Sequence, residues 1–247
     1  IRAGNRPCSF SLIAYNRCML IHGLQKMTLV DYPGKVAAIL FTGACNFRCP
    51  FCQNAALVLH PDMEEVISDD EIFSYLRKRK GLLDGVVVTG GEPTLASDLI
   101  DYIKRLKDIG YSVKLDTNGY RPDVLQKAVE SGVDYVAMDI KNSLDRYPET
   151  AGIASFDPSL IEHSVEYLAE DRVEYEFRTT VMHELHDEES FRKIAYMARH
   201  SHVYYLQSYS DAGDIINPIF SAPSPEELEA YSAILRTYIE NVFIRDR

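Results

Sequence analysis

Residues 41–52 read Phe-Thr-Gly-Ala-Cys-Asn-Phe-Arg-Cys-Pro-Phe-Cys and place Cys45, Cys49 and Cys52 within one short segment. The apolar run at 36–41 comes directly before the cysteines and is typical of a buried strand. The C-x3-C-x2-C spacing therefore lies on a loop that leaves a strand. Disulfide scaffolds spread paired cysteines over short secreted chains, so this crowded group indicates reduced cysteines that hold a metal.

Several metals could use such a loop. A [4Fe–4S] cluster is usually held by four cysteine thiolates, and no fourth cysteine lies nearby. A cluster with an open position could bind a substrate atom, as catalytic metals do. The alternatives are a zinc site completed by a histidine and a cluster completed by Cys8 or Cys18. We favour the open cluster, because zinc sites are typically built from separated C-x2-C pairs.

The rest of the chain predicts the fold through a repeated pattern. Val-, Ile- and Tyr-rich runs, which predict strands, lie at 36–41, 86–88, 113–115, 135–140, 175–181 and 203–206. Helical patterns follow them at 68–76, 99–110, 122–132, 158–168, 190–199 and 224–239. Six strand–helix units predict an α/β fold with parallel strands. Because a closed barrel needs eight units, we expect a partial (β/α)6 TIM-like barrel.

Composition excludes several classes of protein. The 247 residues are 46% hydrophobic and 26% charged, which is typical of a globular chain and not of a disordered or fibrous one. The formal net charge of −11 argues against nucleic acid or an anionic membrane surface as the main partner. No apolar run approaches the length of a membrane span. We expect residues 1–18 to be an extension and residues 19–247 to form one domain.

A second motif follows the strand expected at 86–88. Gly90 and Gly91 there could let the backbone come close to a ligand, and Glu92 beside them could accept a hydrogen bond from an ammonium group. The plainer interpretation is a strand-to-helix turn with a solvated Glu92.

The next two strand ends carry acidic residues. Asp116 and Thr117 follow the strand at 113–115, and Asp139 and Lys141 end the strand at 135–140. Residues two apart on a strand point to the same face, so Asp139 and Lys141 could act together. The plainer interpretations are a capped turn and a structural ion pair. In parallel barrels, ligands bind at this end of the strands.

The cysteine loop after the first strand of a partial barrel resembles the radical S-adenosylmethionine (radical SAM) superfamily. The resemblance implies that Cys45, Cys49 and Cys52 hold a [4Fe–4S] cluster. It also implies that the amino and carboxylate groups of S-adenosylmethionine chelate the fourth iron. Phe51, before the last cysteine, and Asn54, two residues after it, occupy positions typical of the family.

The resemblance gives the strand-end motifs cofactor-binding roles. Gly90, Gly91 and Glu92 match the family's motif for the methionine amino group. The segments with Asp116 and Thr117, and with Asp139 and Lys141, resemble those of glycyl-radical-enzyme activases. There they surround the cofactor's carboxylate and ribose and can hold a monovalent cation. Arg178, on the fifth expected strand, is a further candidate for the carboxylate.

Residues 23–54 resemble the family of activating proteins of anaerobic ribonucleoside-triphosphate reductase. This implies a cytoplasmic oxidoreductase that cleaves S-adenosylmethionine reductively and generates a glycyl radical on a partner enzyme. A flavodoxin- or ferredoxin-type protein would supply the electron, and neither nucleic acid nor membrane would take part.

Two alternatives remain open: a radical SAM enzyme for a small molecule, as in deazapurine biosynthesis, and a non-catalytic iron–sulfur or zinc module. His183-Glu184-Leu185-His186 lacks the H-E-x-x-H spacing of a metalloprotease, so we expect a solvated loop there. Gln207 and Tyr209, near the last expected strand, receive no role.

Overall fold

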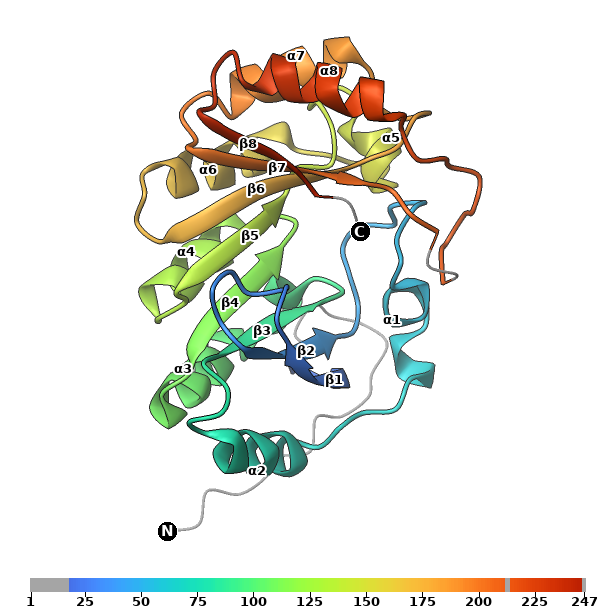
Figure 1. Ribbon diagram of the computed structural model, residues 1–247. Helices are drawn as coiled ribbons and strands as arrows, with labels where there is room; N and C mark the ends of the chain where they lie inside the picture. The colour runs from blue at the N-terminus through green and yellow to red at the C-terminus, as the bar shows by residue number, and fades with distance from the viewer. Residues whose placement is uncertain (1–17, 212–213, 246–247) are drawn as a thin grey trace.

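The computed structural model describes residues 18–211 and 214–245, and a single sheet organises them (Figure 1). Its eight strands lie side by side in chain order from β1 to β8. They are β1 (Ile21–Thr28), β2 (Ala37–Thr42), β3 (Gly85–Gly90), β4 (Ser112–Thr117), β5 (Tyr135–Asp139), β6 (Glu174–Val181), β7 (Val203–Ser208) and β8 (Asn241–Arg245).

The strands from β2 to β8 are parallel, and β1 runs antiparallel to β2. The six predicted strands are β2 to β7, so the α/β partial barrel is confirmed. The two outer strands extend it to eight. The final helical pattern was wrong beyond Leu235, because α8 (Pro225–Leu235) ends there and the chain enters β8 soon afterwards.

Helices cover the outer face of the sheet (Figure 1). The predicted helices are α2 (Asp69–Arg79), α3 (Leu99–Ile109), α4 (Pro122–Glu130), α6 (Pro158–Ala169), α7 (Glu188–Met197) and α8. Two short helices, α1 (Ala55–Leu59) and α5 (Tyr147–Ala151), were not predicted. Caps fix the boundaries: Ser68 and Ser224 accept from backbone N–H groups in the first turns of α2 and α8, and Gly110 ends α3 in the left-handed conformation. No helix among the described residues combines the length and apolarity that crossing a bilayer requires.

The inner face of the sheet changes character along the barrel. Part of it is a small apolar cluster that includes Tyr32, Ile39 and Tyr135. Beside the Tyr135 hydroxyl lies the carboxylate of Glu176 on β6, which is fully buried. Both of its carboxylate oxygens accept from Arg245 of β8, at 3.0 and 2.8 Å, and the Tyr135 hydroxyl donates to it at 3.0 Å. This pair ties β8 to the barrel interior, because a buried carboxylate needs a charged partner.

We predict that Glu176→Gln lowers the free energy of unfolding by about 2–3 kcal/mol, because Arg245 would lose its anionic partner inside the barrel. Chemical denaturation measures the change. Glu174→Gln is the matched control, since Glu174 lies on the same strand but is exposed. Equal stability of the two variants would contradict this account of β8.

Candidate functional site

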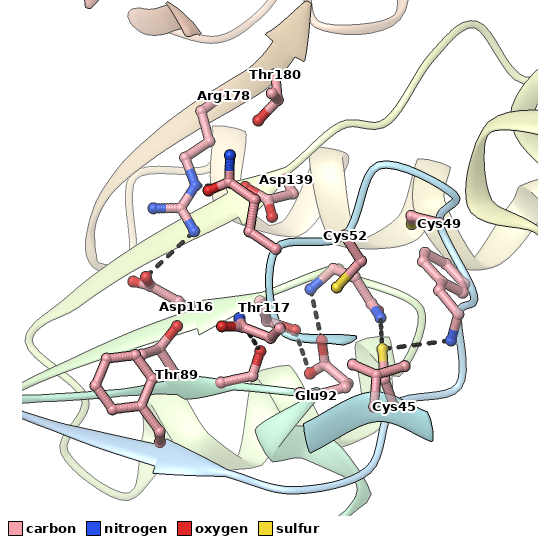
Figure 2. Close-up of a pocket in the computed structure, with 18 of the residues that line it drawn as sticks. Cys45, Cys49, Cys52, Thr89, Glu92, Asp116, Thr117, Asp139, Arg178 and Thr180 are labelled. Carbon is pink, nitrogen blue, oxygen red and sulfur yellow. Dashed lines mark hydrogen bonds and ion pairs between the residues drawn. The ribbon is translucent and has the colours of Figure 1, made fainter. Parts of the chain in front are cut away.

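A cavity of about 380 Å³ lies at the carboxyl ends of the parallel strands. All twelve residues that the sequence assigned to the site line it. They are Cys45, Cys49, Cys52, Asn54, Gly90, Gly91, Glu92, Asp116, Thr117, Asp139, Lys141 and Arg178. Figure 2 labels the three cysteines, Glu92, Asp116, Thr117, Asp139 and Arg178 among them. The structure therefore brings together loops that are distant in the sequence, while the role of each residue stays a prediction.

The cysteine loop is held in place from both sides. The Arg48 guanidinium donates to the Cys45 carbonyl at 2.6 Å and to the Phe47 carbonyl at 2.7 Å. The Arg48 backbone N–H donates to Ala151 O of α5 at 2.8 Å. Helix α5, which the sequence did not predict, thus fixes the loop that carries the sulfurs.

The thiols of Cys45 and Cys49 have little tendency to ionise without a cation nearby. Burial raises the pKa of Cys45 to about 12 and that of Cys49 to about 11. A metal that binds thiolates must displace these protons and replace them with positive charge. Among the described residues, no three Cys, His, Asp or Glu side chains are arranged to hold a single metal ion. The three cysteines do line the same cavity, and three thiolates are the ligand set of an iron–sulfur cluster that lacks one protein ligand. Cys18 is not part of the cavity lining that the structure describes. Cys8 lies outside the described residues.

Gly90 at the end of β3 and Gly91 after it let two backbone segments pack closely together. The segment that approaches them is the one that leads into the cysteine loop, and not a ligand. A Cβ atom on Gly91 would lie 1.8 Å from Ala44 O, and Gly90 has a φ of +112° that favours glycine. The Glu92 backbone N–H donates to Ala44 O at 2.8 Å. Asn54 donates from its side chain to Gly90 O at 3.0 Å. The loops after β2 and β3 therefore form one interlocked unit.

Glu92 is buried, so the plainer interpretation of a solvated glutamate was wrong. Its carboxylate accepts four hydrogen bonds: from the Thr94 N–H at 3.1 Å, the Thr94 hydroxyl at 2.6 Å, the Thr117 hydroxyl at 2.7 Å and the Asn118 N–H at 2.7 Å. Burial raises the pKa of Glu92, against the effect of these donors. In this arrangement Glu92 braces the end of β3 against the end of β4.

Charged side chains face the cavity beside the cysteines. Arg178 lies between Asp139, to which its Nε donates, and Asp116, whose Oδ2 is 3.2 Å from its Nη2 (Figure 2). Lys141 Nζ is 2.8 Å from Asp139 Oδ2. Burial alone would raise the pKa of Asp139, but Arg178 and Lys141 hold it well below its usual range. Arg178 therefore supplies positive charge where the resemblance allowed a monovalent cation.

The expectation of a solvated loop at residues 183–186 was wrong for its second half. His183 is exposed and pairs with Glu227 at 2.7 Å, whereas His186 is buried. His186 Nδ1 accepts from the Met182 N–H at 3.2 Å, so its Nε2 carries the proton and donates to Lys141 O at 3.0 Å. Burial lowers the pKa of His186 to about 4. His186 thus positions the backbone that carries Lys141.

Asn118 and Gln207 are among the further polar residues that line the cavity. The side-chain amide of Asn118 donates to Asn46 Oδ1 at 2.8 Å and lies 3.8 Å from Cys45 Sγ. The signal that could have found Asn118 is its place directly after Asp116 and Thr117 at the same strand end. Gln207 also lines the cavity, but Tyr209 is absent from the described lining.

We predict that the stability of the protein falls as the pH drops from 6.5 towards 4, partly through His186. Its folded pKa lies below the unfolded value, so the unfolded chain binds more protons in this window. His186→Gln should remove up to about 3 kcal/mol of this pH dependence, because the pKa of His186 falls from 6.5 in the unfolded chain to about 4 in the folded one. Denaturation at several pH values measures it.

His183→Gln serves as the matched control for His186→Gln, because His183 is exposed on the same loop. If both variants keep the pH dependence of the unmodified protein, the buried neutral state of His186 is contradicted.

The sequence is similar to a family of known proteins and to several individual relatives. The model of the Radical SAM superfamily matches residues 39–195. A "putative glycyl-radical enzyme activating enzyme" of Methanocaldococcus jannaschii is 32% identical over 238 residues, which cover 92% of this chain and 95% of that protein. A "probable GTP 3′,8-cyclase" of Saccharolobus solfataricus is 34% identical over 127 residues, which cover 48% of this chain and 39% of the cyclase.

Solved structures share the fold. A radical SAM methyltransferase from Sphaerobacter thermophilus superposes with a TM-score of 0.69 at 16% identity, over 89% of this chain and 68% of that one. A domain of pyruvate-formate lyase-activating enzyme from Bacteroides vulgatus has a TM-score of 0.54 at 23% identity, over 65% of this chain and 98% of the domain. At these identities the similarity establishes the architecture alone.

Proposed function

The chain belongs to the radical SAM superfamily, and from this premise we propose that it activates a glycyl-radical enzyme. The observation that carries the proposal is the cavity, where three cysteines and the glycine-rich and acidic strand ends meet. The similarity to an activating enzyme spans 92% of this chain, whereas the similarity to a cyclase that acts on a small molecule spans 48%. This difference favours the activase over the small-molecule alternative.

We propose that Cys45, Cys49 and Cys52 hold a [4Fe–4S] cluster through their sulfurs. When bound, such a cluster supplies one electron that breaks the C5′–S bond of S-adenosylmethionine, which yields methionine and a 5′-deoxyadenosyl radical. The cysteine loop offers three sulfurs on the cavity wall, so one iron remains available to the methionine amino and carboxylate groups.

The charged groups of the cavity suit the zwitterionic end of that cofactor. Lys141 and Arg178 can attract its carboxylate, and the carbonyl of Gly90 and the carboxylates near it can accept from its ammonium group. Asn54 and Thr117 orient the loops on which these acceptors lie. Because Arg178 bridges Asp116 and Asp139, this proposal needs no monovalent cation at that place.

The proposed partner is an enzyme with a glycine that becomes the radical site. The 5′-deoxyadenosyl radical would take the hydrogen from the Cα of that glycine and leave as 5′-deoxyadenosine. Anaerobic ribonucleoside-triphosphate reductase is the first candidate, and a flavodoxin- or ferredoxin-type protein in the cytoplasm would supply the electron. A purely electron-transferring module would have no use for the buried charges around the cavity.

We predict that anaerobically reconstituted protein, given dithionite and S-adenosylmethionine, releases 5′-deoxyadenosine, which chromatography detects. In Cys49→Ala, the rate of 5′-deoxyadenosine release should fall by a factor of about ten or more, because two cysteine sulfurs hold a cluster poorly. Absence of 5′-deoxyadenosine from the unmodified protein would remove the enzyme proposal.

The partner is tested by adding anaerobic ribonucleoside-triphosphate reductase to the same mixture. A glycyl-radical doublet in the electron paramagnetic resonance spectrum is expected. The reductase with its radical-site glycine replaced by alanine is the control and should remain silent. Release of 5′-deoxyadenosine without a doublet would assign the enzyme to a different substrate.

A further inference from the structure

Hydrogen bonding to the three sulfurs of the cavity is unequal. In the described part of the chain, Cys45 Sγ accepts from the Phe47 backbone N–H at 3.3 Å and lies 3.8 Å from the amide nitrogen of Asn118. The second distance is within the range for a sulfur acceptor, whose radius exceeds that of oxygen. Both donors point to the same sulfur, so Cys45 differs electrostatically from Cys49 and Cys52.

The orientation of the Asn118 amide follows from its other contacts. Its Oδ1 accepts from the Tyr120 N–H at 3.0 Å, so the oxygen is committed to the turn and the NH2 group faces the cysteine loop. Its backbone N–H donates to Glu92 Oε2 at 2.7 Å. Asn118 is 5% exposed. The amide is therefore held in place before any cofactor binds.

We propose that Asn118 raises the reduction potential of the cluster by donating a hydrogen bond to the Cys45 sulfur. Reduction adds negative charge to the cluster and its sulfurs, and a fixed N–H dipole stabilises that charge more in the reduced than in the oxidised state. The effect is strong at a buried site, where water does not screen the dipole. Asn118 is a positioning and tuning residue, because it acts through the cysteine.

Asn118 also joins the two loops that the proposed cofactor would contact. Its backbone connects to Glu92 after β3, and its side chain connects to Asn46 and Cys45 after β2. A purely structural role would come from the bond to Asn46. A tuning role would come from the bond to sulfur. The experiment therefore has to separate these two bonds.

The test is a redox titration of the anaerobically reconstituted protein, monitored by electron paramagnetic resonance of the reduced cluster. Asn118→Leu removes the donor without adding charge. Asn118→Ser removes the amide, and its shorter side chain retains an oxygen that can accept from the Tyr120 N–H but no group that reaches the sulfur. Both variants should bind iron as the unmodified protein does and show a midpoint potential shifted to more negative values.

Asn46→Ala is the control, because it removes the partner at 2.8 Å and leaves the Asn118 amide free to face the sulfur. It also removes the Asn46 Oδ1 that lies 3.8 Å from Cys45 Sγ, and the loss of an oxygen beside the sulfur does not make reduction harder. Its potential should equal that of the unmodified protein or be more positive. An unchanged potential in both Asn118 variants would overturn the proposal, and so would an equal negative shift in Asn46→Ala. Loss of the cluster from both Asn118 variants would also overturn it, since Asn118 would then serve assembly.

This inference rests on the proposed cluster, and the two can fail separately. If the unmodified protein assembles no four-iron cluster, the proposed function is contradicted. If a complete cluster forms and its potential does not depend on Asn118, only the tuning role is contradicted.

Discussion

The site depends on one constraint, which is the burial of thiols at the end of β2. Cys45 and Cys49 lie where burial raises the pKa of a thiol, so their thiolates need a positive partner. Contacts with the neighbouring loops hold the cysteine loop in this position without a bound metal or cofactor. Gly91 lies against Ala44 with no room for a side chain, and Arg48 fastens the loop to α5 through its backbone. The chain thus forms a preshaped site in which the thiols of Cys45 and Cys49 ionise only when a positive charge lies beside them.

A second feature is that the two cations and the two aspartates of the cavity already form ion pairs with one another. Arg178 bridges Asp116 and Asp139, and Lys141 adds a further cation beside Asp139. Such preorganisation limits the rearrangement that binding requires, because the groups need not be collected from solvent. Deeper in the barrel, Glu176 pairs with Arg245 and fastens β8, and Arg178 Nη1 lies 4.0 Å from Glu176 Oε1, which connects this pair to the charges of the cavity. One buried network therefore serves binding near the cysteines and stability below them.

Much of this could be predicted from the sequence, for identifiable reasons. Buried parallel strands are continuous apolar runs, and ligands collect at their ends, so the twelve predicted residues share one cavity. Edge strand β1 is half exposed, and in edge strand β8 only Val242 is buried, so neither carries a clear pattern. The hydrogen bonds that Glu92 accepts from Thr117 and Asn118, and the contact of Asn118 with Cys45, depend on tertiary neighbours. No local pattern encodes such neighbours, and the burial of His186 escaped prediction for the same reason.

Mössbauer spectroscopy of protein reconstituted with ⁵⁷Fe, with and without S-adenosylmethionine, tests whether the three cysteines leave one iron of a cluster open. We expect a four-iron cluster in which one iron changes its spectrum when S-adenosylmethionine is added, because Cys45, Cys49 and Cys52 would leave that iron without a protein sulfur. A protein that binds no iron, or a cluster whose four irons all ignore S-adenosylmethionine, would contradict this expectation.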